Sequence, residues 1–223
     1  MKYGKNYFQE VYMSRSKENA SNKFNRHLDF ISKYKKTGNL LDMGFAKGDF
    51  LKAAEKKGNW KLFGIDVSEY AYNITKNFVK AQLELVNLNK EKIPFPDKFF
   101  DVIYASEILE HLNPQNLMLK EIFRCLKPEG FFFLTMPNRP KQKPLKWDLT
   151  CGHINLHNKK SILNKFMNAG FNKNKINVRY EGILGVGFIR HIFRKFGLLH
   201  NIILSKHDGI FKNKKSLIVF GNK

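Results

Sequence analysis

Two neighbouring stretches, Leu40-Leu-Asp-Met-Gly-Phe-Ala-Lys-Gly48 and Trp60-Lys-Leu-Phe-Gly-Ile-Asp66, decide the fold of this 223-residue chain. The first predicts a short buried strand that stops at Gly44 and turns into a helix from about Gly48. The second predicts another strand, and Gly58 before it suits the C-cap of the helix. A strand, a helix and a second strand in such quick succession are typical of a parallel pair joined by a crossover helix.

The same alternation continues through the chain. Further strands are predicted at 83–86, 100–105, 131–136 and 216–220, and further helices at 68–78, 113–127 and 158–169, after a helical segment within 1–36. Ser68 is a good N-cap for the first of these helices. This order predicts an α/β fold, with a mostly parallel sheet and helices on both faces, whose ligands bind at the carboxyl ends of the strands.

Composition places the chain among globular proteins, because 43% of its residues are hydrophobic and 26% are charged. The only cysteines, Cys125 and Cys151, exclude a disulfide scaffold and a four-thiolate zinc site, and no metal site is expected. The sequence contains no apolar run of the length that a membrane span needs, and its first residues are polar. We therefore expect a cytoplasmic protein. The alternative is a cytoplasmic protein that also contacts a membrane peripherally.

The charge is strongly positive, with 40 Lys and Arg against 19 Asp and Glu. Such a charge is compatible with nucleic-acid binding, since lysines that neutralise phosphates release counterions. The lysines are spread along the chain, however, which equally fits a general compositional bias. Nucleic acid stays an alternative partner at this point.

Two acids stand at the ends of predicted strands in this cationic chain. Asp66 follows Gly44 by 22 residues, which suits a carboxylate that accepts hydrogen bonds from both ribose hydroxyls of a nucleoside. Asp42 directly precedes the glycine turn, where it would repel the pyrophosphate of a dinucleotide by roughly 4 kcal/mol at about 4 Å. The pair therefore favours a nucleoside without phosphate that carries a positive charge, and S-adenosylmethionine fits this description.

Four segments resemble the class I S-adenosylmethionine-dependent methyltransferases. They are LLDMGFAKGDFL from Leu40, LFGIDVS from Leu62, IPFPDKFFDVIYASEILEHL from Ile93 and LKPEGFFFLTMPN from Leu126, and they occur in the order of that family. The later GHINLHNKKSILNKFMNAGF, from Gly152, is similar to the branch of O-methyltransferases that act on quinone precursors and sugars. The resemblance implies a Rossmann-like, seven-stranded sheet in a single domain over 1–223, with a cofactor-binding half at 37–138 and a substrate-side half at 139–223.

The resemblance also implies which residues hold the cofactor. Asp42, Gly44, Ala46 and Gly48 would surround its methionine part together with Ala105 and Ser106, while Asp66 would bind the ribose and Val67 would pack on the adenine. The sequence departs from the family at two places. The usual Gly-Cys-Gly turn reads Gly44-Phe45-Ala46, and Asn87 or Asn89 replaces the acid that accepts a hydrogen bond from the adenine amine, which an amide oxygen can still do.

Histidines after the fourth and fifth strands are the candidate catalytic residues, since an acceptor hydroxyl must lose its proton. His153 is predicted as the base, with Asp148 near enough in sequence to orient it. His111 follows Glu107 by one helical turn, which favours an orienting role, and His157 is expected at the entry of the next helix.

The acceptor is expected to be a small molecule, or one linked to a sugar or a lipid. A helical insert at about 182–204 has apolar residues on one face and basic residues on the other, which suits either a cover over the acceptor or contact with anionic lipid. Two other functions stay open. One is methylation of RNA or tRNA, although Ala105-Ser106-Glu107-Ile108 lacks the polar-Pro-Pro-aromatic turn of nucleobase amino methylases. The other is a non-catalytic partner protein that binds the cofactor.

Overall fold

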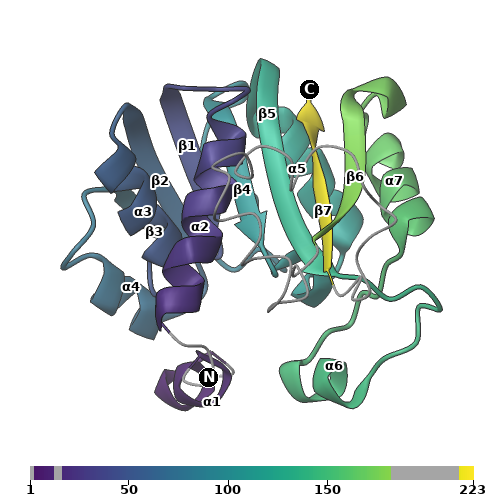
Figure 1. The fold of residues 1–223 in the computed structure, drawn as a ribbon, viewed down its shortest axis with the longest axis horizontal. Coiled ribbons are helices and arrows are strands. Elements are labelled where there is room, and N and C mark those ends of the chain that lie inside the picture. Colours follow the sequence, from purple (N-terminus) through teal and green to yellow (C-terminus); the bar gives the residue numbers. More distant parts are fainter. Residues whose placement is uncertain (1–2, 13–16, 182–215) are drawn as a thin grey trace, which may run out of the picture.

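The computed structural model describes residues 3–12, 17–181 and 216–223. Seven strands form one sheet in the order β3-β2-β1-β4-β5-β7-β6, as Figure 1 shows. The strands are β1 (Gly38–Met43), β2 (Trp60–Asp66), β3 (Gln82–Leu85), β4 (Phe100–Ser106), β5 (Leu126–Pro137), β6 (Ile176–Glu181) and β7 (Ser216–Asn222). Only β7 runs antiparallel to its neighbours β5 and β6, so the predicted mostly parallel, seven-stranded sheet is confirmed.

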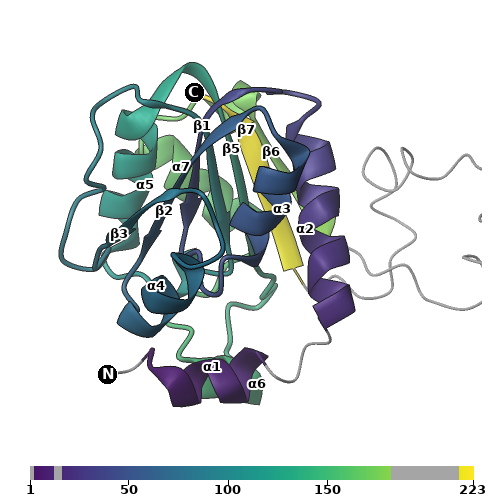
Figure 2. The same cartoon turned by 90° about the vertical axis from the view of Figure 1, so that its left-hand side faces the viewer.

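Helices cover both faces of this sheet, as the turned view in Figure 2 shows. They are α1 (Lys5–Tyr12), α2 (Lys17–Ile31), α3 (Asp49–Lys57), α4 (Glu69–Thr75), α5 (Gln115–Cys125), α6 (Lys146–Cys151) and α7 (Lys159–Asn168), with short 3₁₀ turns at Leu109–His111 and Lys173–Lys175. Residues of α2, α3 and α4 share one apolar cluster, and residues of α5 and α7 share the other. No helix in these described ranges is both long and apolar enough to cross a bilayer.

Alternation along the strands creates the two cores. In β7, Leu217 and Val219 face the cluster under α5 and α7, whereas Ile218 and Phe220 face the cluster under α2 and α3. This is the period-two pattern of a strand that is buried on both sides. Fully buried side chains such as Phe220 remove large apolar areas from water, which is the main force that holds the helices on the sheet.

Local signals in the sequence set several element boundaries. The Ser68 hydroxyl accepts a hydrogen bond from the Ala71 N–H and caps α4, and Gly58 ends α3, as predicted. Two boundaries differ from the prediction. The helix expected over 113–127 spans only Gln115–Cys125, and β5 begins directly at Leu126, because Lys127-Pro-Glu-Gly130 continues the strand instead of separating it from the helix.

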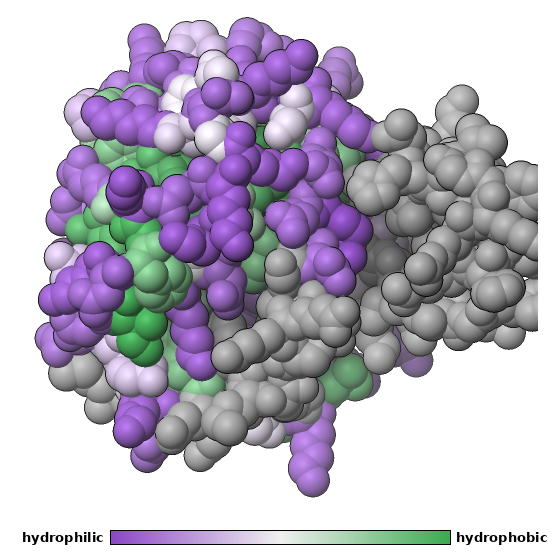
Figure 3. Space-filling view, turned by 60° about the vertical axis from the view of Figure 1, so that its left-hand side comes forward, coloured by the Kyte–Doolittle hydropathy of each residue, from purple (hydrophilic) through white to green (hydrophobic). Residues whose placement is uncertain are grey.

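Outside the core, hydrophilic side chains predominate on the described part of the face that Figure 3 shows, and apolar ones gather mainly toward one side of it. The predicted helical insert at about 182–204 lies outside the described residues.

The two short helices α1 and α6 lie at one end of the sheet in both ribbon views (Figures 1 and 2), and this is the end at which a ligand is expected. The parallel strands β1, β2, β4 and β5 have their carboxyl ends there, and β1 and β4 are neighbours although β2 and β3 come between them in sequence.

Candidate functional site

A cavity of about 320 Å³ opens at the carboxyl ends of β1, β2 and β4. Seven of the ten predicted cofactor residues line it: Gly44, Ala46, Asp66, Val67, Asn87, Asn89 and Ser106. Sheets with this topology bind ligands where the strand order reverses, and the cavity lies at that point. The structure thus brings together residues that are up to 62 positions apart, from Gly44 to Ser106.

Asp66 is held rigidly at the edge of the cavity. Its Oδ2 accepts a hydrogen bond from the Ala46 N–H at 2.9 Å, and its Oδ1 accepts one from the Ser68 N–H at 2.9 Å. Burial raises the pKa of Asp66, although these backbone hydrogen bonds oppose the rise. Each carboxylate oxygen can accept a further hydrogen bond, so Asp66 can receive two hydroxyls of a ligand in a fixed geometry.

Asp42, Gly48 and Ala105 are not among the described residues that line the cavity. Asp42 and Ala105 are buried in β1 and β4, just behind the cavity wall. Gly48 adopts a left-handed conformation, and a Cβ there would lie 2.5 Å from Thr75 Cγ2. Gly48 therefore allows the turn to pack against α4, and in this structure its visible role is packing.

The acids give the cavity a preference for a positively charged ligand. Burial raises the pKa of Asp42 well above its usual range, and the nearby carboxylates of Asp66 and Asp49 raise it further. Negative charge collected here is costly without a counter-charge, and a ligand with an ammonium or sulfonium group would supply one. The residues present therefore fit S-adenosylmethionine.

Several residues of the cavity wall were not predicted. Tyr3, Tyr7 and Phe8 come from the N-terminal segment, and Ser68, Val86, Leu88, Glu107, Ile108 and Leu112 come from loops around the predicted positions. The Ser68 hydroxyl donates to the Tyr3 carbonyl at 2.6 Å, which fastens the N-terminal segment beside Asp66. The sequence around Tyr3 shows helical periodicity but nothing that connects it to strands some 40 to 100 residues away.

The turn that departs from the family pattern contains a strained residue. Gly44 adopts φ 73°, and a Cβ there would lie 2.4 Å from Ile108 Cδ1, so glycine is required. Ala46 adopts φ 48°, in the left-handed region where a side chain costs about 1–2 kcal/mol. The replacement of a family glycine by Ala46 thus preserves the turn at the expense of stability.

Changing Ala46 to glycine should therefore stabilise the protein. The relieved strain exceeds the extra conformational entropy that glycine brings to the unfolded chain, and the net gain is about 0.5–1 kcal/mol, or roughly 1–4 °C in Tm. Calorimetry of Ala46→Gly measures this gain. Ala53→Gly, inside α3, is the matched control and should lose about 1 kcal/mol. A lower Tm for Ala46→Gly would contradict the strain.

The two candidate catalytic histidines lie together beside the cavity, with ring centroids 4.8 Å apart. His111 lines the cavity, whereas His153 is not among the described lining residues and its side chain is only 6% exposed. The predicted partnership of His153 with Asp148 is present, since Nδ1 lies 2.7 Å from Asp148 Oδ1. Of the two histidines, His111 is therefore the one whose ring faces the cavity, and His153 lies behind it.

Asp148 is itself fixed by three further hydrogen bonds. Arg139 donates to both of its oxygens at 2.6 and 2.7 Å, and the Leu145 N–H donates at 2.7 Å. Burial on its own would raise the pKa of Asp148, but the hydrogen bonds from Arg139, Leu145 and His153 lower it to about 2. Asp148 is a permanent anion that holds His153 in one orientation.

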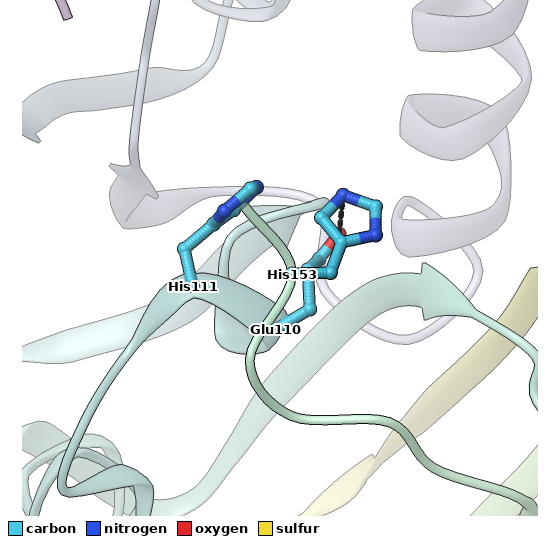
Figure 4. Close-up of side chains that lie close together, drawn as sticks. All are labelled: Glu110, His111 and His153. Atoms are coloured by element: carbon cyan, nitrogen blue, oxygen red, sulfur yellow. Dashed lines mark ion pairs between the residues drawn. The ribbon is translucent and has the colours of Figure 1, made fainter. Parts of the chain in front are cut away.

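Sequence reasoning missed Glu110, which follows the predicted Glu107 and precedes His111. Glu110 is 1% exposed, and its two oxygens are the only buried side-chain polar atoms in the described part of the chain that lack a hydrogen-bond partner. Burial raises the pKa of Glu110 well above its usual range, and the Glu107 carboxylate raises it further. His153 Nε2 lies 3.9 Å from Glu110 Oε1, as the dashed line in Figure 4 marks.

Glu107 belongs to a different network from the one predicted. Its Oε1 accepts a hydrogen bond from the Thr135 hydroxyl, which also lies 2.9 Å from the Ser106 hydroxyl. Lys23 of α2 donates to Ser106 at 3.2 Å.

His157, the third histidine, is buried near the start of α7. Its ring lies between the side chains of Gln115 and Ser161, and burial lowers its pKa to about 4, so it is a structural residue.

Comparisons with known proteins identify the family of this chain. Residues 16–175, well over half of the chain, match the family model described as a methyltransferase domain. The ubiquinone/menaquinone biosynthesis C-methyltransferase UbiE of Vibrio parahaemolyticus is 30% identical over 48% of this chain and 44% of its own length. The mitochondrial arginine-hydroxylase NDUFAF5 of Rattus norvegicus is 32% identical over 41% of this chain and 26% of its own. The chain thus spans less than half the length of these curated relatives.

The fold agrees over a longer range than the sequence. A SAM-dependent methyltransferase from Archaeoglobus fulgidus superposes with a TM-score of 0.67 over 97% of this chain and 98% of its own, at 17% identity. At that identity the likeness concerns the fold alone. With the family match over residues 16–175 and the cavity at the carboxyl ends of the strands, this chain belongs to the methyltransferase family and has the fold of its S-adenosylmethionine-dependent members.

Proposed function

We propose that this chain transfers a methyl group from S-adenosylmethionine to an oxygen of an acceptor that is either a small molecule or one linked to a sugar or a lipid. The observation that carries the proposal is that Asp66, rigid and able to accept two hydroxyls, lines the same cavity as Ser106, Glu107 and His111. The nucleoside would bind at the Asp66 end with Val67 and Asn87, and its sulfur would lie toward Ser106.

The chemistry asks little of the protein beyond alignment and proton removal. When bound, S-adenosylmethionine supplies a methyl group on a positively charged sulfur, and the transfer leaves a neutral thioether. The acceptor oxygen forms the new bond to the methyl carbon as its hydroxyl proton leaves. His111 is suited to take that proton, because its Nδ1 lies 3.3 Å from the Gly152 carbonyl, which can only accept, so Nε2 carries the lone pair.

Incubating the chain with methyl-labelled S-adenosylmethionine and fractionated cell extract tests this function. We expect label in a low-molecular-weight or lipid fraction, and NMR of the product distinguishes a methoxy group from the ring methyl group that a C-methyltransferase such as UbiE makes. Label in RNA would favour the nucleic-acid alternative. Binding of S-adenosylhomocysteine without label in any fraction would favour a non-catalytic partner protein, and either result would overturn the proposal.

A lipid-linked acceptor is supported by an exposed apolar patch next to the site. Leu145, Leu149 and Ile154 are 58%, 68% and 57% exposed, on and beside α6. The exposed Lys141, Lys143 and Lys146 lie in the same stretch of chain. Apolar side chains with flanking lysines suit the surface of an anionic membrane, and α6 lies at the end of the sheet that holds the cavity (Figure 2).

Co-sedimentation with vesicles that contain phosphatidylglycerol tests this contact. The chain should bind, binding should weaken with salt, and the variant Leu145→Glu/Leu149→Glu should lose at least about tenfold in partitioning. Leu117→Glu is the matched control, since Leu117 is 60% exposed on α5 and away from the patch. Phe193→Glu tests the predicted lipid contact of residues 182–204 separately. Equal binding by the Leu145/Leu149 and Leu117 variants would remove the role of α6.

A further inference from the structure

Glu110, His111 and His153 surround a common point beside the cavity, as Figure 4 shows. One ligand atom from each residue lies within 4.8 Å of the others. Glu110 and His111 come from the 3₁₀ turn after β4, and His153 comes from the loop after α6, so the point is enclosed from two separate segments of chain. Ligand atoms around a tetrahedral ion lie about 3.4 Å apart, so small side-chain rotations would bring these three into range.

Glu110 provides the first reason to expect a positive ion at this point. It is an acid buried to 1% exposure, and neither of its oxygens has a hydrogen-bond partner in the described chain. Buried carboxylates are otherwise paired with a cation or satisfied by several donors. Within the cluster, His153 Nε2 lies 3.9 Å from Glu110 Oε1, which is too far for a hydrogen bond.

The second reason is the way the two histidines are held. His111 Nδ1 lies 3.3 Å from the Gly152 carbonyl, and His153 Nδ1 lies 2.7 Å from the carboxylate of Asp148. Both partners accept hydrogen bonds, so both rings carry the proton on Nδ1 and leave a lone pair on Nε2. Metal-bound histidines are held in the same way, with a carbonyl or carboxylate on the distal nitrogen. Arg139 in turn holds Asp148 with two hydrogen bonds.

We propose that Glu110, His111 and His153 bind one divalent transition-metal ion, with two imidazole nitrogens and one carboxylate oxygen as ligands. This donor set favours Zn²⁺, Mn²⁺ or Fe²⁺ over Mg²⁺, which prefers oxygen ligands throughout. Three protein ligands leave coordination positions open, and His111 lines the cavity, so an acceptor oxygen can reach them.

The consequence for the reaction rests on the proposed function. A hydroxyl bound to the ion becomes more acidic and releases its proton to water, so His111 would act as a ligand instead of taking the proton itself. This site could not be found from the sequence, because His111 and His153 are 42 positions apart and no ligand-spacing motif includes both.

Metal binding is measurable without any knowledge of the acceptor. The full chain, freed of any affinity tag and treated with chelator, should bind one Zn²⁺ per chain in titration calorimetry, gain thermal stability with Zn²⁺, and show visible absorption with Co²⁺. His111→Ala and Glu110→Gln should each weaken Zn²⁺ binding by at least about 100-fold. Glu129→Gln, which removes an exposed acid far from the cluster, should bind as the unmodified chain does.

Two results would overturn the inference: the absence of stoichiometric binding, or binding that neither His111→Ala nor Glu110→Gln weakens while both variants keep a cooperative thermal transition. Selective binding of Mg²⁺ would also contradict it. The outcome is separate from that of the proposed function. Methyl transfer that persists in chelator supports His111 as the base and removes the ion from the reaction. Tight Zn²⁺ binding without methyl transfer to any acceptor removes the proposed function alone.

Discussion

Replacing His111 with alanine should lower kcat by roughly 10²–10⁴-fold, the range that a general acid or base contributes. Of the two histidines, His111 is the one that lines the cavity in the described part of the chain, so an acceptor can meet its ring. Affinity for S-adenosylmethionine should change little, because the predicted ribose and adenine contacts, Asp66 and Val67, come from the end of β2 and not from the turn that holds His111. Single-turnover kinetics and calorimetry on the same preparation separate these two effects.

His153→Ala provides an informative comparison. If His111 takes the proton directly, His153 is a positioning residue that packs edge-on against it at 4.8 Å, and its loss should cost less than the loss of His111. If the two residues hold a metal ion together, both variants should lose similar activity. Thr150→Ala on α6 controls for local disturbance, since Thr150 is exposed. Nearly unchanged kcat in His111→Ala would exclude both roles.

Replacing Asp66 with alanine should weaken binding of S-adenosylmethionine by about 1.5–3 kcal/mol, or roughly 10–160-fold in Kd. The loss arises because hydrogen bonds to a charged acceptor are stronger than neutral ones, and because Asp66 is already fixed by the backbone of Ala46 and Ser68. Calorimetry with S-adenosylhomocysteine, which carries the same ribose, should show the same loss.

The variant also removes the acceptor of two backbone N–H groups, so its folding must be checked. Asp66→Asn keeps one oxygen for these groups and separates loss of charge from loss of structure. Glu84→Ala is the matched control, since Glu84 lies on the neighbouring strand β3 and is not among the described residues that line the cavity. An unchanged Kd in both Asp66 variants would contradict the assignment of the ribose to this carboxylate.

The sequence by itself determined the sheet and those residues of the site that directly follow or end a single strand. Periodicity and turn residues are local signals, so β1, β2 and β4 could be placed, and with them Gly44 and Asp66 at the edge where parallel strands end. The β7 strand could be found in the same way, whereas β6 was not predicted, although Ile176–Glu181 alternates apolar and polar residues as a strand at the edge of a sheet does. The number of strands came from the family resemblance.

Only the tertiary structure decided which side chains from other segments surround those strand ends. Tyr3 and Phe8 reach the cavity from the N-terminal segment, outside the cofactor-binding half, and Glu110 lies 3.9 Å from His153 across 43 residues of chain. The ranking of His153 above His111 relied on the nearness of Asp148 in sequence, which is real, but nearness to Asp148 does not determine exposure to the cavity. Local spacing in the sequence determines which side chains lie on the same helix or strand. Packing between elements then decides whether such a side chain is buried, lacks a hydrogen-bond partner or faces a ligand. No short motif encodes that packing, because it joins segments that are far apart in the chain.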